Sequence, residues 1–258
     1  MKHLDIQRIL GCIVQRIFPC IGKHTRCYRS AGRTTPGNVR LVNEDAILMR
    51  DDIGLWAVAD GLGGHFAGDI ASRVVMEHLR TLERGSSSGS DFQYAVDEAL
   101  ACANDQLRQL ALHRQSDIIG STVVVVLEDN EYMLCGWVGD SRAYVYESHH
   151  LKQLTQDHVV GSMCDLTQFD PHAVAASGML TRAIGAQERV QVDWVRAKRN
   201  TQQLYLLCSD GITKELSDAD IAQHCRCARS ATCLVDCLLQ TALDRAGRDN
   251  ISAIVLTP

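Results

Sequence analysis

Short apolar runs bounded by turn residues recur along the chain and predict β-strands. The expected strands cover residues 46–49, 55–59, 122–127, 132–138, 143–146, 190–195, 204–208 and 251–256. The three runs between residues 122 and 146 are joined by short connections, with a turn at Asp129-Asn130 between the first two. Short connections require neighbouring strands to be antiparallel, so the pattern predicts antiparallel sheets.

Two pairs of segments show helical periodicity instead. The first pair covers residues 66–84 and 91–112, separated by the sequence GSSSGS at residues 85–90, and we expect its members to pack antiparallel. Apolar side chains of the second member fall on one face: Phe92, Ala95, Val96, Ala99, Leu100, Ala103 and Leu107. The second pair begins at Ser217, where Asp220 completes a capping-box signature, and ends with residues 230–246 before Gly247.

This order of elements predicts an α+β fold in which two antiparallel β-sheets form a sandwich flanked by the helix pairs, four layers in the order αββα. We expect one domain over residues 24–258. Residues 1–23 are interpreted as a basic amphipathic extension, because apolar residues recur there at near-helical spacing between Lys and Arg. Residues 156–185 match no period, and a loop of that length inside a domain usually acts as a lid or flap.

Composition and charge exclude several classes of protein. With 46% hydrophobic and 22% charged residues the chain is of ordinary globular composition. Its longest apolar runs, such as residues 122–127, fall far short of the roughly 18 residues of a membrane-spanning helix. The net charge of -5 provides no field that would attract nucleic acid. Residues 1–40 carry eight basic and one acidic side chain, whereas the rest of the chain is acidic.

The 11 cysteines indicate a reducing, cytoplasmic location, because their number is odd and Arg16 interrupts the only stretch that could serve as a signal peptide. Four of them, Cys225, Cys227, Cys233 and Cys237, are close enough in sequence to suggest a zinc site. They lack paired C-x2-C spacing and lie in a helical pattern, so we interpret them as small buried apolar residues.

The most informative pattern is an apolar strand followed by Asp-Gly, which occurs at Asp60-Gly61 and again at Asp210-Gly211. Asp-Gly is typical of a hairpin turn, but both pairs precede a helical pattern. Two more acidic sites accompany strands, Glu44-Asp45 and Asp249. Carboxylates gathered at strand ends would repel one another without cations, and oxygen ligands without His or Cys suit Mg2+ or Mn2+.

Six ordered motifs then identify a resemblance. They are RLVNED at residues 40–45, VADGLGG at 58–64, GST at 120–122, GDSR at 139–142, SDG at 209–211 and RDN at 248–250. In order and spacing they resemble the metal-dependent serine/threonine protein phosphatases of type 2C, in particular the bacterial members, over residues 26–258. That family has a β-sandwich flanked by helix pairs, which agrees with the architecture expected from the periodicity.

The resemblance implies a site with two Mn2+ or Mg2+ ions. Asp60 would bridge them, Asp210 and Asp249 would complete the shell of the first ion, and Glu44 with the carbonyl of Gly61 would hold the second. Asp140, in GDSR, matches the position that binds a third, weaker ion in bacterial members.

Two further positions match residues that act on water and on phosphate. Asp45 matches a residue that orients the attacking water, and Arg40 matches the phosphate-binding arginine, whose planar fork suits two phosphate oxygens. The implied reaction is hydrolysis of phosphoserine and phosphothreonine by a cation-activated water without a phosphoenzyme. Many eukaryotic relatives carry His after Asp-Gly, whereas this chain has Leu62, so we expect a water to protonate the leaving group. His65 is a weaker candidate for that role.

Two alternatives and several partners follow from the same sequence. The C-x5-R strings that start at Cys20, Cys27 and Cys102 would suit a cysteine phosphatase, but they lack a phosphate-cradling loop opening a helix. A phosphatase-like module that binds phosphoproteins without turnover remains the alternative. The expected partners are phosphorylated proteins, a bacterial Ser/Thr kinase and its targets, with type VI secretion as one setting. We expect a monomer that binds no nucleic acid. Residues 1–23 suit weak contact with an anionic membrane surface or with an acidic partner, and equally a helix packed on the domain.

Overall fold

Two antiparallel sheets form the centre of the molecule in the computed structural model, which describes residues 28–63, 67–84, 89–116, 118–161 and 179–258. The first sheet has the strand order β1-β11-β10-β7-β8 and the second the order β2-β3-β5-β6-β9, with β4 paired to β3. The first comprises β1 (Arg29–Thr35), β7 (Arg142–Glu147), β8 (His150–Gln153), β10 (Leu204–Cys208) and β11 (Ile251–Thr257). The second comprises β2 (Asp45–Arg50), β3 (Leu55–Gly63), β4 (Ile119–Ser121), β5 (Val123–Glu128), β6 (Tyr132–Val138) and β9 (Asp193–Lys198).

The central strands are buried on both faces, which explains their nearly continuous apolar runs. Alternate residues of β3, Trp56 and Val58, face the first sheet and pack with residues such as Tyr205 and Leu207 of β10. The intervening residues of β3 belong to a second cluster with α1 and α2. The opposite face of β10 and β11 packs in the same way on α5 and α6. Alternate residues of the strands therefore face opposite layers, and together they form all three interfaces between the four layers.

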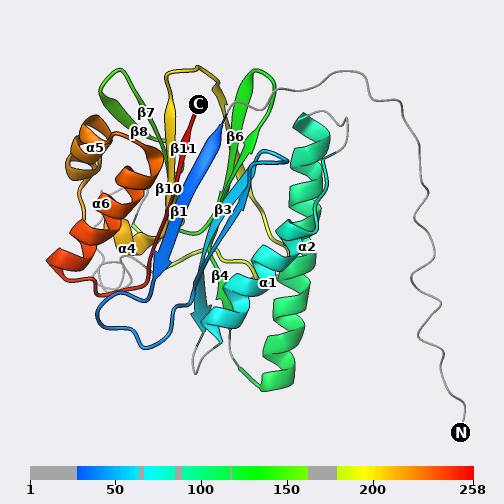
Figure 1. The fold of residues 1–258 in the computed structure, drawn as a ribbon. Helices are drawn as coiled ribbons and strands as arrows, with labels where there is room; N and C mark the ends of the chain where they lie inside the picture. Colours follow the sequence, from blue (N-terminus) through cyan, green and yellow to red (C-terminus); the bar gives the residue numbers. More distant parts are fainter. Residues whose placement is uncertain (1–27, 64–66, 85–88, 117, 162–178) are drawn as a thin grey trace, which may run out of the picture.

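The helices lie on the two outer faces of the sandwich (Figure 1). Helices α1 (Gly68–Arg80) and α2 (Gly89–Arg114) cover the second sheet, and α5 (Asp218–Cys227) and α6 (Ala231–Arg245) cover the first. The predicted capping box is present, because Ser217 N donates to Asp220 Oδ2 and Asp220 N donates to the Ser217 hydroxyl. Gly247 has φ +56° after α6, as expected for a helix stop. The αββα fold class is therefore confirmed.

The structure also contains elements that the apolar pattern did not predict. Strands β1, β4 and β8 and the short helix α4 (Asp210–Thr213) were missed because they are edge strands or too short to show a period. Strand β9 lies about three residues further along the chain than expected, because its register is set by pairing with β6, where Asp193 lies opposite Trp137. Strand β3 does not stop at Asp60-Gly61 but runs to Gly63, because β4 extends the ladder.

The cysteines of the second helix pair only partly match their interpretation. Cys225 is buried in the cluster under α5 and α6, as expected for a small apolar residue. Cys227 and Cys237 are exposed, so the interpretation was wrong for these two. They lie on helix faces that turn away from the core.

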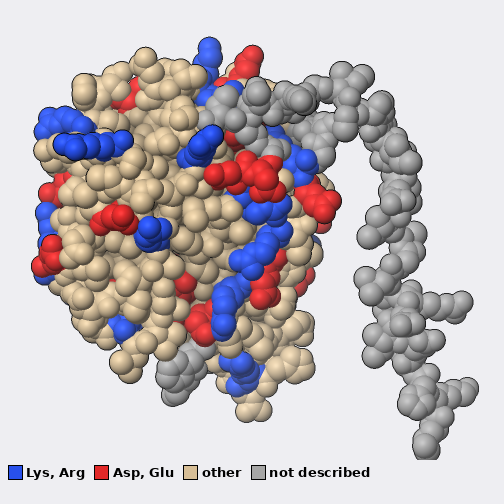
Figure 2. Space-filling model, in the orientation of Figure 1, with Lys and Arg blue, Asp and Glu red and all other residues tan. Residues whose placement is uncertain are grey.

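The surface carries charges of both signs, as the composition of the chain suggests. On the face shown in Figure 2, basic side chains lie next to acidic ones. The surface ion pairs of the molecule include Arg50–Asp52 and Arg73–Asp69. Within the described ranges, no helix combines the length and the hydropathy that spanning a membrane would require. The proposed extension at residues 1–23 lies outside the described residues and stays a prediction.

Candidate active site

A pocket of about 290 Å³ opens where several strands of the two sheets end on the same side of the sandwich. It contains seven of the eight expected site residues: Arg40, Glu44, Asp60, Gly61, Asp140, Asp210 and Asp249. These residues are separated by up to 209 positions in the chain, and the sandwich brings them together. Leu62 lines the pocket as well, so the residue after Asp-Gly does face this site.

Asp60 and the eighth residue, Asp45, lie directly opposite each other on neighbouring strands. Register pairs Asp45 of β2 with Asp60 of β3, and directly opposite residues on one face have Cβ atoms about 4.5–5.5 Å apart. Asp45 is 7% exposed and lies beneath the pocket rather than in its lining. The backbone of Asp60 is held by Thr122, whose hydroxyl accepts from Asp60 N and whose N–H donates to Asp60 O.

The glycine after Asp60 is required by close packing. A Cβ atom on Gly61 would lie 1.9 Å from the carbonyl oxygen of Gly68, at the start of α1. Gly68 in turn packs against Glu44, because a Cβ atom there would lie 2.5 Å from Glu44 Oε1. Glu44 therefore reaches the pocket beside the amino end of α1, and no larger residue fits at either glycine.

Asn250 positions the chain segment that carries Glu44 and Arg40. Its side-chain nitrogen donates to the carbonyl oxygens of Pro36 and Val42, and its Oδ1 accepts from the backbone N–H of Glu44 at 2.9 Å. The sequence motif RDN contains Asn250, but a role in anchoring a segment 206 positions away could not be derived from spacing.

Asp45 connects the two sheets through hydroxyl groups. Its Oδ2 accepts from Ser209 at 2.7 Å and from Ser252 at 2.6 Å, and its Oδ1 is buried with no hydrogen-bond partner. Burial raises the pKa of Asp45 to about 7, and the charges of Asp210 and Asp249 add to the shift. Ser209 belongs to the motif SDG, but the contact of either serine with Asp45 could not be predicted from the sequence.

Burial and the neighbouring carboxylates shift the pKa values of the acidic residues in the pocket. Burial, followed by neighbouring carboxylates, raises the pKa of Asp60 well above its usual value and that of Asp140 to about 6. Burial also raises the pKa of Asp210, although Lys214 opposes the shift. Burial acts on Asp249 too, but the hydrogen bond and charge of Lys214 and the charge of Arg40 outweigh it, so its pKa is lowered.

Two basic side chains already contact these carboxylates. Lys214 Nζ lies 2.6 Å from Asp210 Oδ2 and 2.9 Å from Asp249 Oδ2. Arg40 Nε lies 3.0 Å from Asp249 Oδ1. The resemblance assigned Arg40 to phosphate alone, and the structure gives it a carboxylate partner in addition. Neither contact was expected from the sequence.

The donor set fits hard divalent cations. It consists of carboxylate and carbonyl oxygens, which are the ligands that Mg2+ and Mn2+ prefer. One of these oxygens, Oδ1 of Asp210, is a buried acceptor without a hydrogen-bond partner. Across the described ranges, no three His, Cys, Asp or Glu side chains are already arranged as a ready metal site.

The beginning of the flap is tied to the motif GDSR. Arg142 forms a forked ion pair with Asp157, with its Nη2 2.7 Å from Oδ2, and also donates to the hydroxyl of Tyr144. His158 N donates to Gly139 O, and Gly139 N donates to His158 Nδ1 at 3.1 Å. Residues 162–178 of the flap and the candidate acid His65 lie outside the described residues.

Fold and pocket together define an αββα sandwich with an acidic pocket at the strand ends. The sequence matches the family model described as Protein phosphatase 2C over residues 38–246. The chain therefore belongs to the protein phosphatase 2C family, as the six motifs indicated.

Curated relatives and solved structures agree with this assignment. A serine/threonine phosphatase of Listeria monocytogenes, stp, is 27% identical over 87% of this chain and 93% of the relative. The Mycobacterium tuberculosis phosphatase PstP is 29% identical over 90% of this chain and 45% of its own length. Among solved structures, Pseudomonas aeruginosa PppA, titled a key regulatory component of T6SS, has a TM-score of 0.81 at 33% identity, over 89% of this chain and 97% of that one. The catalytic domain of PstP in complex with two manganese ions has a TM-score of 0.75 at 27% identity, over 89% and 97%.

Proposed function

We propose that this protein hydrolyses phosphoserine and phosphothreonine in protein substrates with the help of bound divalent cations. The observation that carries the proposal is the convergence of Glu44, Asp60, Asp210 and Asp249 in one pocket with Arg40. A phosphoprotein-binding module without turnover has no need for four buried or half-buried carboxylates that repel one another. The similarity to named serine/threonine phosphatases supports the enzyme over the binding module.

The residues of the chain divide the work between cation and substrate. Asp60, Asp210, Asp249, Glu44 and the carbonyl of Gly61 would hold two divalent cations. When bound, the cations neutralise charge on the phosphoryl group and lower the pKa of water. Asp140 is our candidate for a third ion. Of the two metals, Mn2+ has the support of the PstP complex, and Mg2+ suits the same oxygen ligands.

Other side chains orient the reactants. The guanidinium of Arg40 lines the pocket, and its Nε forms an ion pair with Asp249. Its two terminal nitrogens would bind phosphoryl oxygens. Asp45, fixed by Ser209 and Ser252, would orient the attacking water through its unpartnered Oδ1. The apolar side chain of Leu62 supplies no acid, so the leaving alkoxide takes its proton from water.

The experiment is hydrolysis of a phosphothreonine peptide with Mn2+, with Mg2+ and with a chelator. We expect phosphate release with either cation and none in the chelator. The variant Asp105→Asn serves as a control for charge-removing substitutions in the pocket. Asp105 is exposed on α2 outside the pocket, so this variant should release phosphate like the wild type. Tight peptide binding without phosphate release in Mn2+ would support the binding module and refute the enzyme.

The biological setting is a further part of the proposal. We propose that the protein acts in the bacterial cytoplasm as a monomer and reverses a Ser/Thr kinase, with type VI secretion as one setting. The seven described cysteines are all free, which suits a reducing compartment, and the similarity to PppA favours the secretion setting. Comparison of phosphoproteins in cells with and without this chain tests it, because kinase targets should gain phosphate when the chain is removed.

A further inference from the structure

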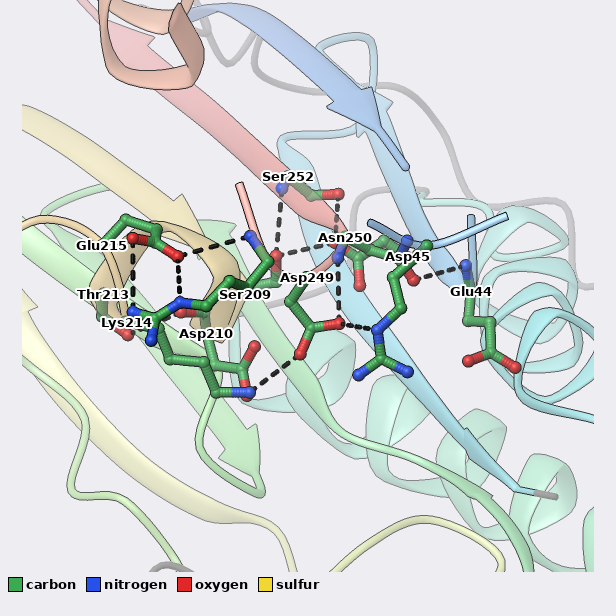
Figure 3. A network of polar contacts seen from close by, with 12 residues as sticks. Glu44, Asp45, Ser209, Asp210, Thr213, Lys214, Glu215, Asp249, Asn250 and Ser252 are labelled. Carbon is green, nitrogen blue, oxygen red and sulfur yellow. Dashed lines mark hydrogen bonds and ion pairs between the residues drawn. The ribbon is translucent and has the colours of Figure 1, made fainter. Parts of the chain in front are cut away.

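Lys214 occupies the space between two carboxylates of the proposed cation site. It follows the last residue of α4, four positions after Asp210, and i,i+4 spacing on a helix directs its side chain toward that carboxylate. Its ammonium lies 2.6 Å from Asp210 and 2.9 Å from Asp249 (Figure 3). The ammonium therefore pairs with both acidic residues that the family resemblance assigns, together with Asp60, to the first ion.

The neighbouring residue fixes Lys214 in this position. The side chain of Glu215 is 5% exposed, and its Oε1 accepts from Arg248 Nε at 2.9 Å. Its carbonyl oxygen accepts from Arg245 at 2.6 Å. Two consecutive residues at the end of α4 are thus paired with two consecutive residues before β11, Lys214 with Asp249 and Glu215 with Arg248. This double pairing holds the segments that carry Asp210 and Asp249 together.

The ammonium neutralises the pair incompletely. It contacts one oxygen of Asp210, while Oδ1 of the same carboxylate remains buried without a hydrogen-bond partner. Lys214 supplies one positive charge to these two carboxylates, and Arg40, 3.0 Å from Asp249 Oδ1, supplies a second, but neither contacts Oδ1 of Asp210. A divalent cation that binds both carboxylates would have to compete with the ammonium for Oδ2 of Asp210 and Oδ2 of Asp249. The Lys214 side chain is 50% exposed, so it can turn into solvent when displaced.

We propose that Lys214 is an internal counter-ion of the cation site, which stabilises the cation-free protein and has to be displaced when Mn2+ or Mg2+ binds. Lys214 thereby weakens cation affinity and makes occupancy of the site depend on the cation concentration around the protein. The proposal rests on the cation site of the proposed function and adds a residue that opposes its filling.

The test is Mn2+ titration calorimetry combined with thermal unfolding in a chelator, on the full chain. Lys214→Met removes the charge and keeps the length of the side chain. We expect about tenfold tighter Mn2+ binding, a lower melting temperature in the chelator, and a larger rise of that temperature on adding Mn2+. Lys214→Arg should retain weak binding. Lys152→Met removes the same charge from the exposed edge strand β8 and should match the wild type.

The sign of the change separates this role from a structural one. If Lys214 only held the fold together, Lys214→Met would bind Mn2+ more weakly, and that result or an unchanged affinity would overturn the proposal. Lys214→Gln is the second variant if Lys214→Met does not fold in chelator, because an amide can still donate to one carboxylate. Wild-type protein that binds no Mn2+ at all would instead refute the cation site.

Discussion

Asp60→Asn should make the cation-free protein more stable while it abolishes catalysis. The substitution preserves the size of a side chain that lies directly opposite Asp45 across β2 and β3, and it removes one of two facing charges. Two unit charges about 5 Å apart at an effective dielectric constant of about 20 repel by about 3 kcal/mol. Because burial raises the pKa of Asp45 to about 7, its carboxyl is partly protonated at neutral pH and the repulsion is only partly present. We therefore expect a gain of about 1 to 3 kcal/mol.

The pH dependence of this gain has a definite sign. The Asp60 carboxyl ionises near its usual pKa of 3.8 in the unfolded chain and well above that value in the folded chain. The folded state without cations therefore loses stability as the pH rises above 3.8, until the folded-state pKa is passed. Asparagine does not ionise, so the advantage of Asp60→Asn should be larger at pH 8 than at pH 5.

Urea unfolding in a chelator measures the stability, and peptide hydrolysis in Mn2+ measures the activity. In Mn2+ the order of stability should reverse, because the wild type gains binding energy that the variant has lost. Catalytic efficiency should fall on the order of a thousandfold, since Asp60 is assigned to both cations. Asp105→Asn, on the exposed surface of α2, should change neither quantity. A variant that is less stable than the wild type in chelator, or one that retains near-normal turnover, would refute the reasoning.

Three further predictions concern other parts of the molecule. Arg40→Ala should lower catalytic efficiency about ten- to a hundredfold through the lost phosphate contact. The control Arg33→Ala, on β1 away from the pocket lining, should leave it unchanged. Equal catalytic efficiency of Arg40→Ala and the wild type would exclude Arg40 from phosphate binding. Arg142→Lys should destabilise the fold by about 1 to 3 kcal/mol in urea unfolding, because lysine cannot form the forked pair with Asp157, and unchanged stability would contradict this. Deletion of residues 1–23 should leave peptide hydrolysis nearly intact and abolish sedimentation with anionic vesicles; loss of catalysis would place the segment in the folded domain.

The sequence predicted the layers of this protein because their cause is local. Central strands such as β6 and β10 were predicted with their observed bounds, since burial on both faces requires uninterrupted apolar residues. Helix α6 was predicted to within a residue at each end because Ser230 and Gly247 mark its limits. Strand β8 was missed because an edge strand needs few apolar residues, and its place is set by pairing with β7.

The sequence by itself also named the residues of the candidate site, because the family motifs specify which acidic residues belong together, and seven of the eight line one pocket. What only the tertiary structure decided is how these residues are charged and held. Ser209 and Ser252 fix Asp45, Asn250 anchors the segment of Glu44, and Lys214 bridges two carboxylates. Most of these contacts join residues far apart in the chain. Hydrogen bonds and ion pairs act over about 3 Å, and only the folding of two sheets against each other brings such residues within that distance.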